Sequence, residues 1–226
     1  MFYGGGSYIM LFVLFILASL ASMGVKSTFN KYHKIRNIKG MTGAEAAEAV
    51  LRNNGIYDVK VERVNGHLTD HYDPRSKTIR LSEPVFDNPS IASVSVACHE
   101  AGHALQHANG YVPLKLRTAI LPVAQLGSQA LWPMFMIGIV LSLPQLITIG
   151  ILFFSFSVVF QILTLPVEFN ASFKAIRMMD EYGILSEEEN SSAKKVLNAA
   201  AMTYVAAAAM AVGQLIRMLL LNRRSD

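Results

Sequence analysis

Residues 98–103 read Cys-His-Glu-Ala-Gly-His, the H-E-x-x-H pattern in which two histidines stand four residues apart. On a helix, His99 and His103 lie one turn apart on the same face, so two imidazole rings can reach one metal ion. Glu100 stands beside them, where its carboxylate can take a proton from an activated water. Zinc binds nitrogen and oxygen ligands and lowers the pKa of a bound water to about 7. The motif therefore predicts a hydrolase with one Zn²⁺ per chain, and first of all a peptidase.

The sequence around the motif supplies the helix that this chemistry needs. Asn88 and Pro89 predict a helix start, with Asn88 as the N-cap, and the helix is expected to cover residues 90–109. Apolar residues recur along it at three- and four-residue spacings, as one buried helix face requires: Ile91, Val94, Cys98, Ala101 and Leu105. Cys98, the single cysteine, is interpreted as a small buried residue of this face rather than a nucleophile.

The composition indicates an integral membrane protein. Of 226 residues, 52% are hydrophobic and 16% are charged, whereas soluble domains average about 25% charged residues. The charges are unevenly distributed, because long uncharged stretches alternate with ordinary polar ones. The net charge of +4 is modest, and the sequence has no basic stripe with interleaved aromatic residues. Nucleic acid is therefore not expected as a partner.

The predicted fold class is a mainly α integral membrane protein with a small α+β zincin-like domain. The alternation of charged and uncharged stretches divides the chain into five predicted segments. Three are membrane segments: an N-terminal transmembrane anchor helix at residues 7–25, a central transmembrane hairpin of two helices at 118–167 and a C-terminal membrane helix at 198–221. The other two are a cytoplasm-facing metallopeptidase segment with the H-E-x-x-H helix at 26–117, and a segment with the third zinc ligand and polar helices at 168–197.

The polar segments contain local signals of their own. Thr42 with Glu45, and Ser186 with Glu189, have the spacing of capping boxes and predict helix starts. Residues 59–64 predict a strand, and residues 68–72 and 78–82 predict a β-hairpin around the turn at 73–76. Strand 78–82 is the expected edge on which an extended peptide docks by strand addition.

Charge placement predicts the orientation in the cell membrane. The first seven residues are uncharged, which argues against a cleaved signal peptide. Five basic residues follow the first apolar run, and the positive-inside rule therefore places the motif on the cytoplasmic side of a multi-pass protein: Lys26, Lys31, Lys34, Arg36 and Lys39. Arg223 and Arg224 at the other end of the chain conflict with this orientation if the last helix crosses fully.

A catalytic zinc site needs a third protein ligand. His107 continues the four-residue step, but it lies about 12 Å along a helix from His99, too far for one ion. Glu168, at the end of an apolar run where a free charge is expensive, is the best candidate. Alternatively it marks only the membrane boundary, and Asp180 and Glu181 are weaker rivals. A second polar cluster is interpreted as hairpin loop residues, with a separate metal site as the alternative: His67, Asp70, His71 and Asp73.

Three stretches resemble the YugP-like membrane zinc metallopeptidases: GHLTDHYDPRSKTIRLS at 66–82, HEAGHALQH at 99–107 and VEFNAS at 167–172. The resemblance covers nearly the whole chain. It implies a gluzincin-like site in which His99, His103 and Glu168 bind zinc and Glu100 is the general base. Asn170 stands where an acidic residue is expected in that family, and its implied role is to orient a histidine through its amide.

The predicted function is that of a membrane-bound zinc endopeptidase that acts on protein or peptide substrates, including membrane-associated ones. His107, His71 and Arg177 are candidates for stabilising the oxyanion or contacting substrate. A catalytically silent zinc-binding scaffold or chaperone is the alternative. An intramembrane protease and a transporter with a coincidental motif are disfavoured, because polar residues precede the motif and its helix is intact. An oligomer or a regulatory membrane partner stays open.

Overall fold

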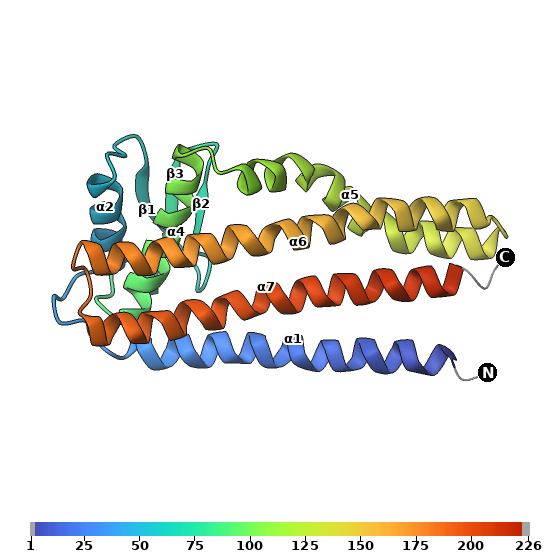
Figure 1. Ribbon diagram of the computed structural model, residues 1–226, viewed down its shortest axis with the longest axis horizontal. Helices are drawn as coiled ribbons and strands as arrows, with labels where there is room; N and C mark the ends of the chain where they lie inside the picture. Colours follow the sequence, from blue (N-terminus) through green and yellow to red (C-terminus); the bar gives the residue numbers. More distant parts are fainter. Residues whose placement is uncertain (1–2, 223–226) are drawn as a thin grey trace. The chain divides into compact units, whose positions relative to one another are not determined.

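The computed structural model describes residues 3–222, shown as a ribbon in Figure 1. The elements in chain order are α1 (Tyr3–His33), α2 (Gly43–Asn53), β1 (Lys60–Val64), β2 (His71–Asp73), β3 (Thr78–Ser82), α3 (Glu83–Phe86), α4 (Ile91–Ala108), α5 (Val112–Val140), α6 (Pro144–Glu181) and α7 (Glu187–Asn222). The prediction of a mainly helical protein with a small sheet is confirmed. Arg223 and Arg224 lie outside the described residues.

The chain divides into two compact units, and α1, α6 and α7 contribute to both. The first unit, as far as the described residues reach, consists of the chain up to Ala21, Val112–Pro166 and the chain from Thr203. The second consists of Ser22–Tyr111 and Val167–Met202. The H-E-x-x-H motif and Glu168 therefore belong to the same unit.

The first unit has the surface of a membrane domain. Within residues 3–222, four helices are long and apolar enough to cross a bilayer: α1, α5, α6 and α7. Large apolar side chains such as Phe12, Ile139 and Leu152 are exposed along them, as lipid-facing residues would be. Arg217 is buried, with its guanidinium carbon 4.2 Å from the centroid of the Tyr8 ring. This cation–π contact accommodates the charge that interrupts the last apolar segment.

The second unit is built around α4, which packs on α2 and on the sheet (Figure 1). The capping-box prediction for α2 is confirmed, because the Glu45 N–H donates to Thr42 Oγ1 and the Thr42 N–H donates to the Glu45 carboxylate. The box at the start of α7 is confirmed by the same pair of bonds between Ser186 and Glu189. The predicted N-cap of α4 is wrong by two residues: Ser90, not Asn88, accepts a hydrogen bond from the Ser93 N–H.

The sheet differs from the sequence expectation in the position of its strands. In the described residues it has three strands in the order β1-β3-β2, with β1 parallel and β2 antiparallel to β3. β3 is therefore the central strand, and the prediction that residues 78–82 form a free edge is wrong. The first strand of the hairpin is also shorter than expected, because the Asp70 carboxylate accepts hydrogen bonds from the Ser82 backbone and hydroxyl where further strand pairing would occur.

Candidate metal centre

Two histidines of α4 face one carboxylate of α6. His99 and His103 stand one turn apart with their ring centroids 4.7 Å from each other. Their Nε2 atoms lie 3.3 Å and 3.5 Å from the same oxygen, Glu168 Oε2. Glu168 is only 3% exposed, and it lies inside the continuous helix α6 rather than at its end. The three residues of the sequence prediction therefore form one cluster, in which all ligand atoms lie within 4.8 Å of one another.

The cluster fits a zinc ion by donor type and by spacing. Two imidazole nitrogens and one carboxylate oxygen are the donor set of catalytic zinc sites that keep a fourth position open. Zinc–ligand bonds of about 2.0–2.1 Å in a tetrahedron place neighbouring donor atoms about 3.3 Å apart. The observed separations of 3.3 Å and 3.5 Å are close to this value, so an ion can be held with little movement.

The outer nitrogen of each histidine is also held. His99 Nδ1 lies 3.1 Å from Ser172 Oγ, and His103 Nδ1 lies 3.0 Å from Gln106 Oε1. Such outer partners orient metal-binding imidazoles and fix which nitrogen is free for the metal. Neither Ser172 nor Gln106 was singled out from the sequence. Their spacing could have identified them, since Ser172 is one turn after Glu168 and Gln106 is one turn after His103, each on the same helix face as the metal-binding candidate.

The approach of the two helices depends on a small residue within the motif. A Cβ atom on Gly102 would lie 2.8 Å from the backbone oxygen of Ala171. Real Cβ atoms do not approach a backbone oxygen so closely, so any other residue at position 102 would push α6 away from α4. Since Ala171 follows Glu168 by three residues, that shift would also move the carboxylate. The glycine of H-E-A-G-H thus helps to place the third member of the cluster.

The cluster concentrates negative charge in a buried place. Glu100 is 8% exposed and belongs to the same helix as the histidines. Burial by itself would lower the pKa of His103, but the hydrogen bond to Glu168 and the charges of Glu100 and Glu168 outweigh it and raise that pKa. These carboxylates therefore favour a positive charge at the cluster, whether a proton or a metal ion. Burial raises the pKa of the Cys98 thiol, which argues against Cys98 as a nucleophile.

Comparison with known proteins agrees with this geometry. The profile of the family described as "Putative neutral zinc metallopeptidase" matches residues 7–223. The chain belongs to this zinc metallopeptidase family. It is also 48% identical over 179 residues to a protein of Bacillus subtilis (strain 168) described as "Putative membrane protease YugP". The aligned region covers 78% of this chain and 80% of that protein. No solved structure gives a significant match.

In this metallopeptidase family member, His107 lies one turn beyond His103 on α4 and outside the cluster. Its Nδ1 lies 2.8 Å from the hydroxyl of Tyr72 on β2. Burial raises the pKa of Tyr72 to about 12, helped by the charges of Asp58 and Asp73, so the hydroxyl keeps its proton at neutral pH. His71 precedes Tyr72 on the strand and points to the other face of the sheet, where its Nδ1 contacts the carbonyl oxygen of Thr69.

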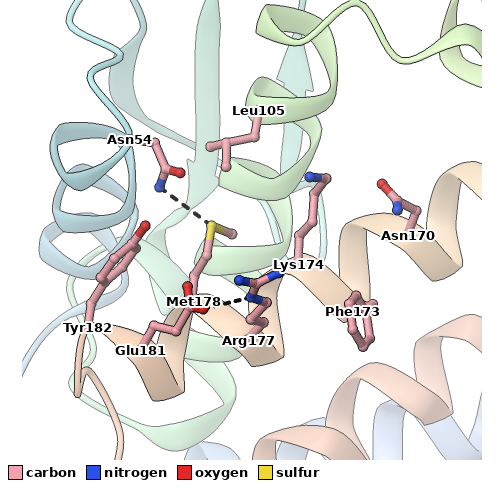
Figure 2. Close-up of a pocket in the computed structure, with 9 residues that line it drawn as sticks. All are labelled: Asn54, Leu105, Asn170, Phe173, Lys174, Arg177, Met178, Glu181 and Tyr182. Carbon is pink, nitrogen blue, oxygen red and sulfur yellow. Dashed lines mark hydrogen bonds and ion pairs between the residues drawn. The ribbon is translucent and has the colours of Figure 1, made fainter.

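Asn170 and Arg177 line a pocket of about 290 Å³ (Figure 2). Asn170 Oδ1 accepts a hydrogen bond from Gln106, whose own side-chain oxygen lies 3.0 Å from His103 Nδ1. Arg177 pairs with Glu181 at 2.7 Å. At 100° per residue, both leave α6 about 180–200° around the helix from Glu168. Arg177 is therefore not brought to the cluster, and Leu105 of α4 completes the lining of the pocket next to Asn170.

The second polar cluster of the sequence is dispersed. The Asp73 carboxylate accepts hydrogen bonds from Ser76 and Arg80. The Asp70 carboxylate accepts a hydrogen bond from the Ser82 backbone N–H. The His67 ring packs edge-on against Phe29. Within residues 3–222, the side chains placed close enough together to hold a metal ion are His99, His103 and Glu168. The interpretation as hairpin loop residues fits His67 and Asp70, which precede β2, whereas His71 and Asp73 belong to β2 itself.

Proposed function

We propose that the protein is a membrane-bound zinc-dependent endopeptidase. The observation that carries the proposal is the convergence of His99 Nε2 and His103 Nε2 on Glu168 Oε2, next to the buried Glu100. In this proposal the three converging residues hold one zinc ion and Glu100 stays outside the ligand set. Such an ion supplies Lewis acidity and lowers the pKa of water to about 7.

The proposed work of Glu100 is proton transfer. One of its carboxylate oxygens takes a proton from the attacking water and then delivers it to the nitrogen of the leaving amine. Ser172 and Gln106 keep the two histidine rings oriented during this exchange. Their buried setting also excludes bulk water from the inner side of the cluster.

The free edge of β2 is the proposed docking strand for an extended substrate. In the described part of the chain β2 pairs with β3 alone, so its other edge offers unpaired backbone groups. The Tyr72 hydroxyl of this strand contacts His107 of α4. The edge of β2 therefore lies near the helix that carries the two histidines of the cluster. If the Tyr72 hydroxyl donates to Nδ1, the Nε2–H of His107 is left to donate to a substrate carbonyl.

Metal removal tests the proposed function. Purified full-length chain in detergent is expected to contain about one zinc per chain and to cleave a casein-type substrate. A chelator should abolish cleavage, and added Zn²⁺ should restore it. One firmly bound zinc without cleavage of casein or of membrane-protein substrates would instead favour the silent scaffold.

The catalytic side is proposed to face the cytoplasm. If α1, α5, α6 and α7 all cross the bilayer, then residues 34–111 and the end of α6 emerge on one side, and the short connection after α5 emerges on the other. The basic residues that follow the first apolar run favour the cytoplasm for the former side.

Cysteine labelling in intact cells tests this orientation. The native Cys98 is buried, so its background labelling is low. A cysteine at Tyr57, which is 80% exposed, is expected to react with an impermeant maleimide only after the cells are permeabilised. The matched cysteine at Leu141, between α5 and α6, should react in intact cells. The reversed pattern would contradict a cytoplasmic site.

A further inference from the structure

Gln106 is a fully buried amide between the two helices that carry the cluster. A buried amide is costly unless its polar atoms find partners. Each polar atom of this one does: Oε1 lies 3.0 Å from His103 Nδ1, while Nε2 lies 2.8 Å from the backbone oxygen of Val167 and 3.0 Å from Asn170 Oδ1. Gln106 therefore joins a histidine of α4 to the backbone and a side chain of α6.

The backbone contact decides how the amide is oriented. A carbonyl oxygen such as that of Val167 only accepts hydrogen bonds, so the NH₂ group of Gln106 must face it. The oxygen of Gln106 must then face His103, and the only way to satisfy that contact is for His103 Nδ1 to carry a hydrogen. A neutral His103 consequently has its free lone pair on Nε2, the atom that faces Glu168. Ser172 cannot impose this on His99, because a hydroxyl both donates and accepts.

The same amide also acts on the other ligand. Val167 directly precedes Glu168, so the hydrogen bond from Gln106 fixes the α6 backbone next to the carboxylate. The contact between Gly102 and Ala171 limits how closely the helices approach, whereas the Gln106 bonds limit how far they separate or slide. One side chain thus sets the tautomer of one proposed ligand and the position of another.

We propose that Gln106 is the positioning residue of the metal centre: its amide holds His103 with Nε2 directed to the metal and ties α6 so that Glu168 meets the same ion. This inference rests on the proposed zinc site.

Zinc affinity of the Gln106→Met variant tests the inference without relying on catalysis. Methionine has a similar size, cannot donate to Val167 or Asn170, and offers His103 only a weakly accepting sulfur. By chelator competition, zinc binding is expected to weaken about 10–100-fold, the usual effect of losing a partner behind a metal ligand. The visible absorption of Co²⁺-loaded protein should change in intensity as the ligand geometry loosens. Gln125→Met, the same change at an exposed position of α5, should match the parent in both measurements.

A milder variant covers the case in which Gln106→Met does not fold. Asn170→Ala withdraws one of the three bonds and is expected to weaken zinc binding several-fold. Parent-like affinity and Co²⁺ spectra in Gln106→Met, or in Asn170→Ala if the methionine variant is unfolded, would overturn the role of Gln106. A parent chain that binds no zinc would instead overturn the proposed function.

Discussion

Replacing Glu100 by glutamine is expected to lower peptide hydrolysis about 10²–10⁴-fold, the range typical for loss of a general base. Glutamine keeps the size of the side chain but cannot take a proton from water. The converging ligand atoms belong to His99, His103 and Glu168, so zinc content and affinity should stay close to those of the parent. Zinc analysis and a cleavage assay on the same preparation measure both effects.

The control for this variant is Glu48→Gln, which makes the same change in an exposed ion pair with Arg52. It should retain parental activity. Equal cleavage by the Glu100→Gln variant and the parent would remove Glu100 from the proposed mechanism. Because the inactive variant should keep its fold, membrane proteins that accumulate in cells expressing it, but not in cells with the parent, are candidate substrates.

Replacing Glu168 by glutamine is expected to have the other large effect, now on zinc itself. The variant loses a charged ligand rather than a partner behind one, so the zinc affinity should fall by more than the 10–100-fold typical of such partners. Hydrolysis should fall with it at limiting zinc. Removal of the carboxylate also removes its hydrogen bond and its charge, two of the interactions that raise the pKa of His103, while the charge of Glu100 remains.

Glu181→Gln is the matched control, because it makes the same substitution farther along α6, where the carboxylate pairs with exposed Arg177. Chelator competition on the two variants separates a ligand from a structural carboxylate. If Glu168→Gln bound zinc as tightly as Glu181→Gln, Glu168 would only mark the membrane boundary.

The parts of the fold that sequence predicted correctly are governed by local interactions. The H-E-x-x-H spacing places two histidines on one helix face whatever surrounds the helix. The capping boxes at Thr42 and Ser186 involve residues three positions apart. Helix length and hydropathy alone identify candidate membrane spans.

The errors arose where neighbours distant in sequence decide the outcome. Strand order in a sheet depends on pairing between segments far apart, and β1 reaches across to β3 rather than to its successor β2. The N-cap of α4 moved to Ser90 because the Pro89 carbonyl accepts a hydrogen bond from the backbone of Asn37, a residue of another segment. The neighbouring Ser93 N–H then found its partner in the Ser90 hydroxyl.

The candidate site shows the same division. Sequence by itself determined two histidines and a glutamate on one helix, an apolar chain, and a short set of carboxylates that could complete the site. Only the tertiary structure decided which carboxylate does so, and how the histidines are held. Glu168 reaches His99 and His103 because α6 packs on α4 at Gly102 and is tied there by Gln106. Those contacts bridge more than sixty residues of sequence, and no local spacing rule can specify them.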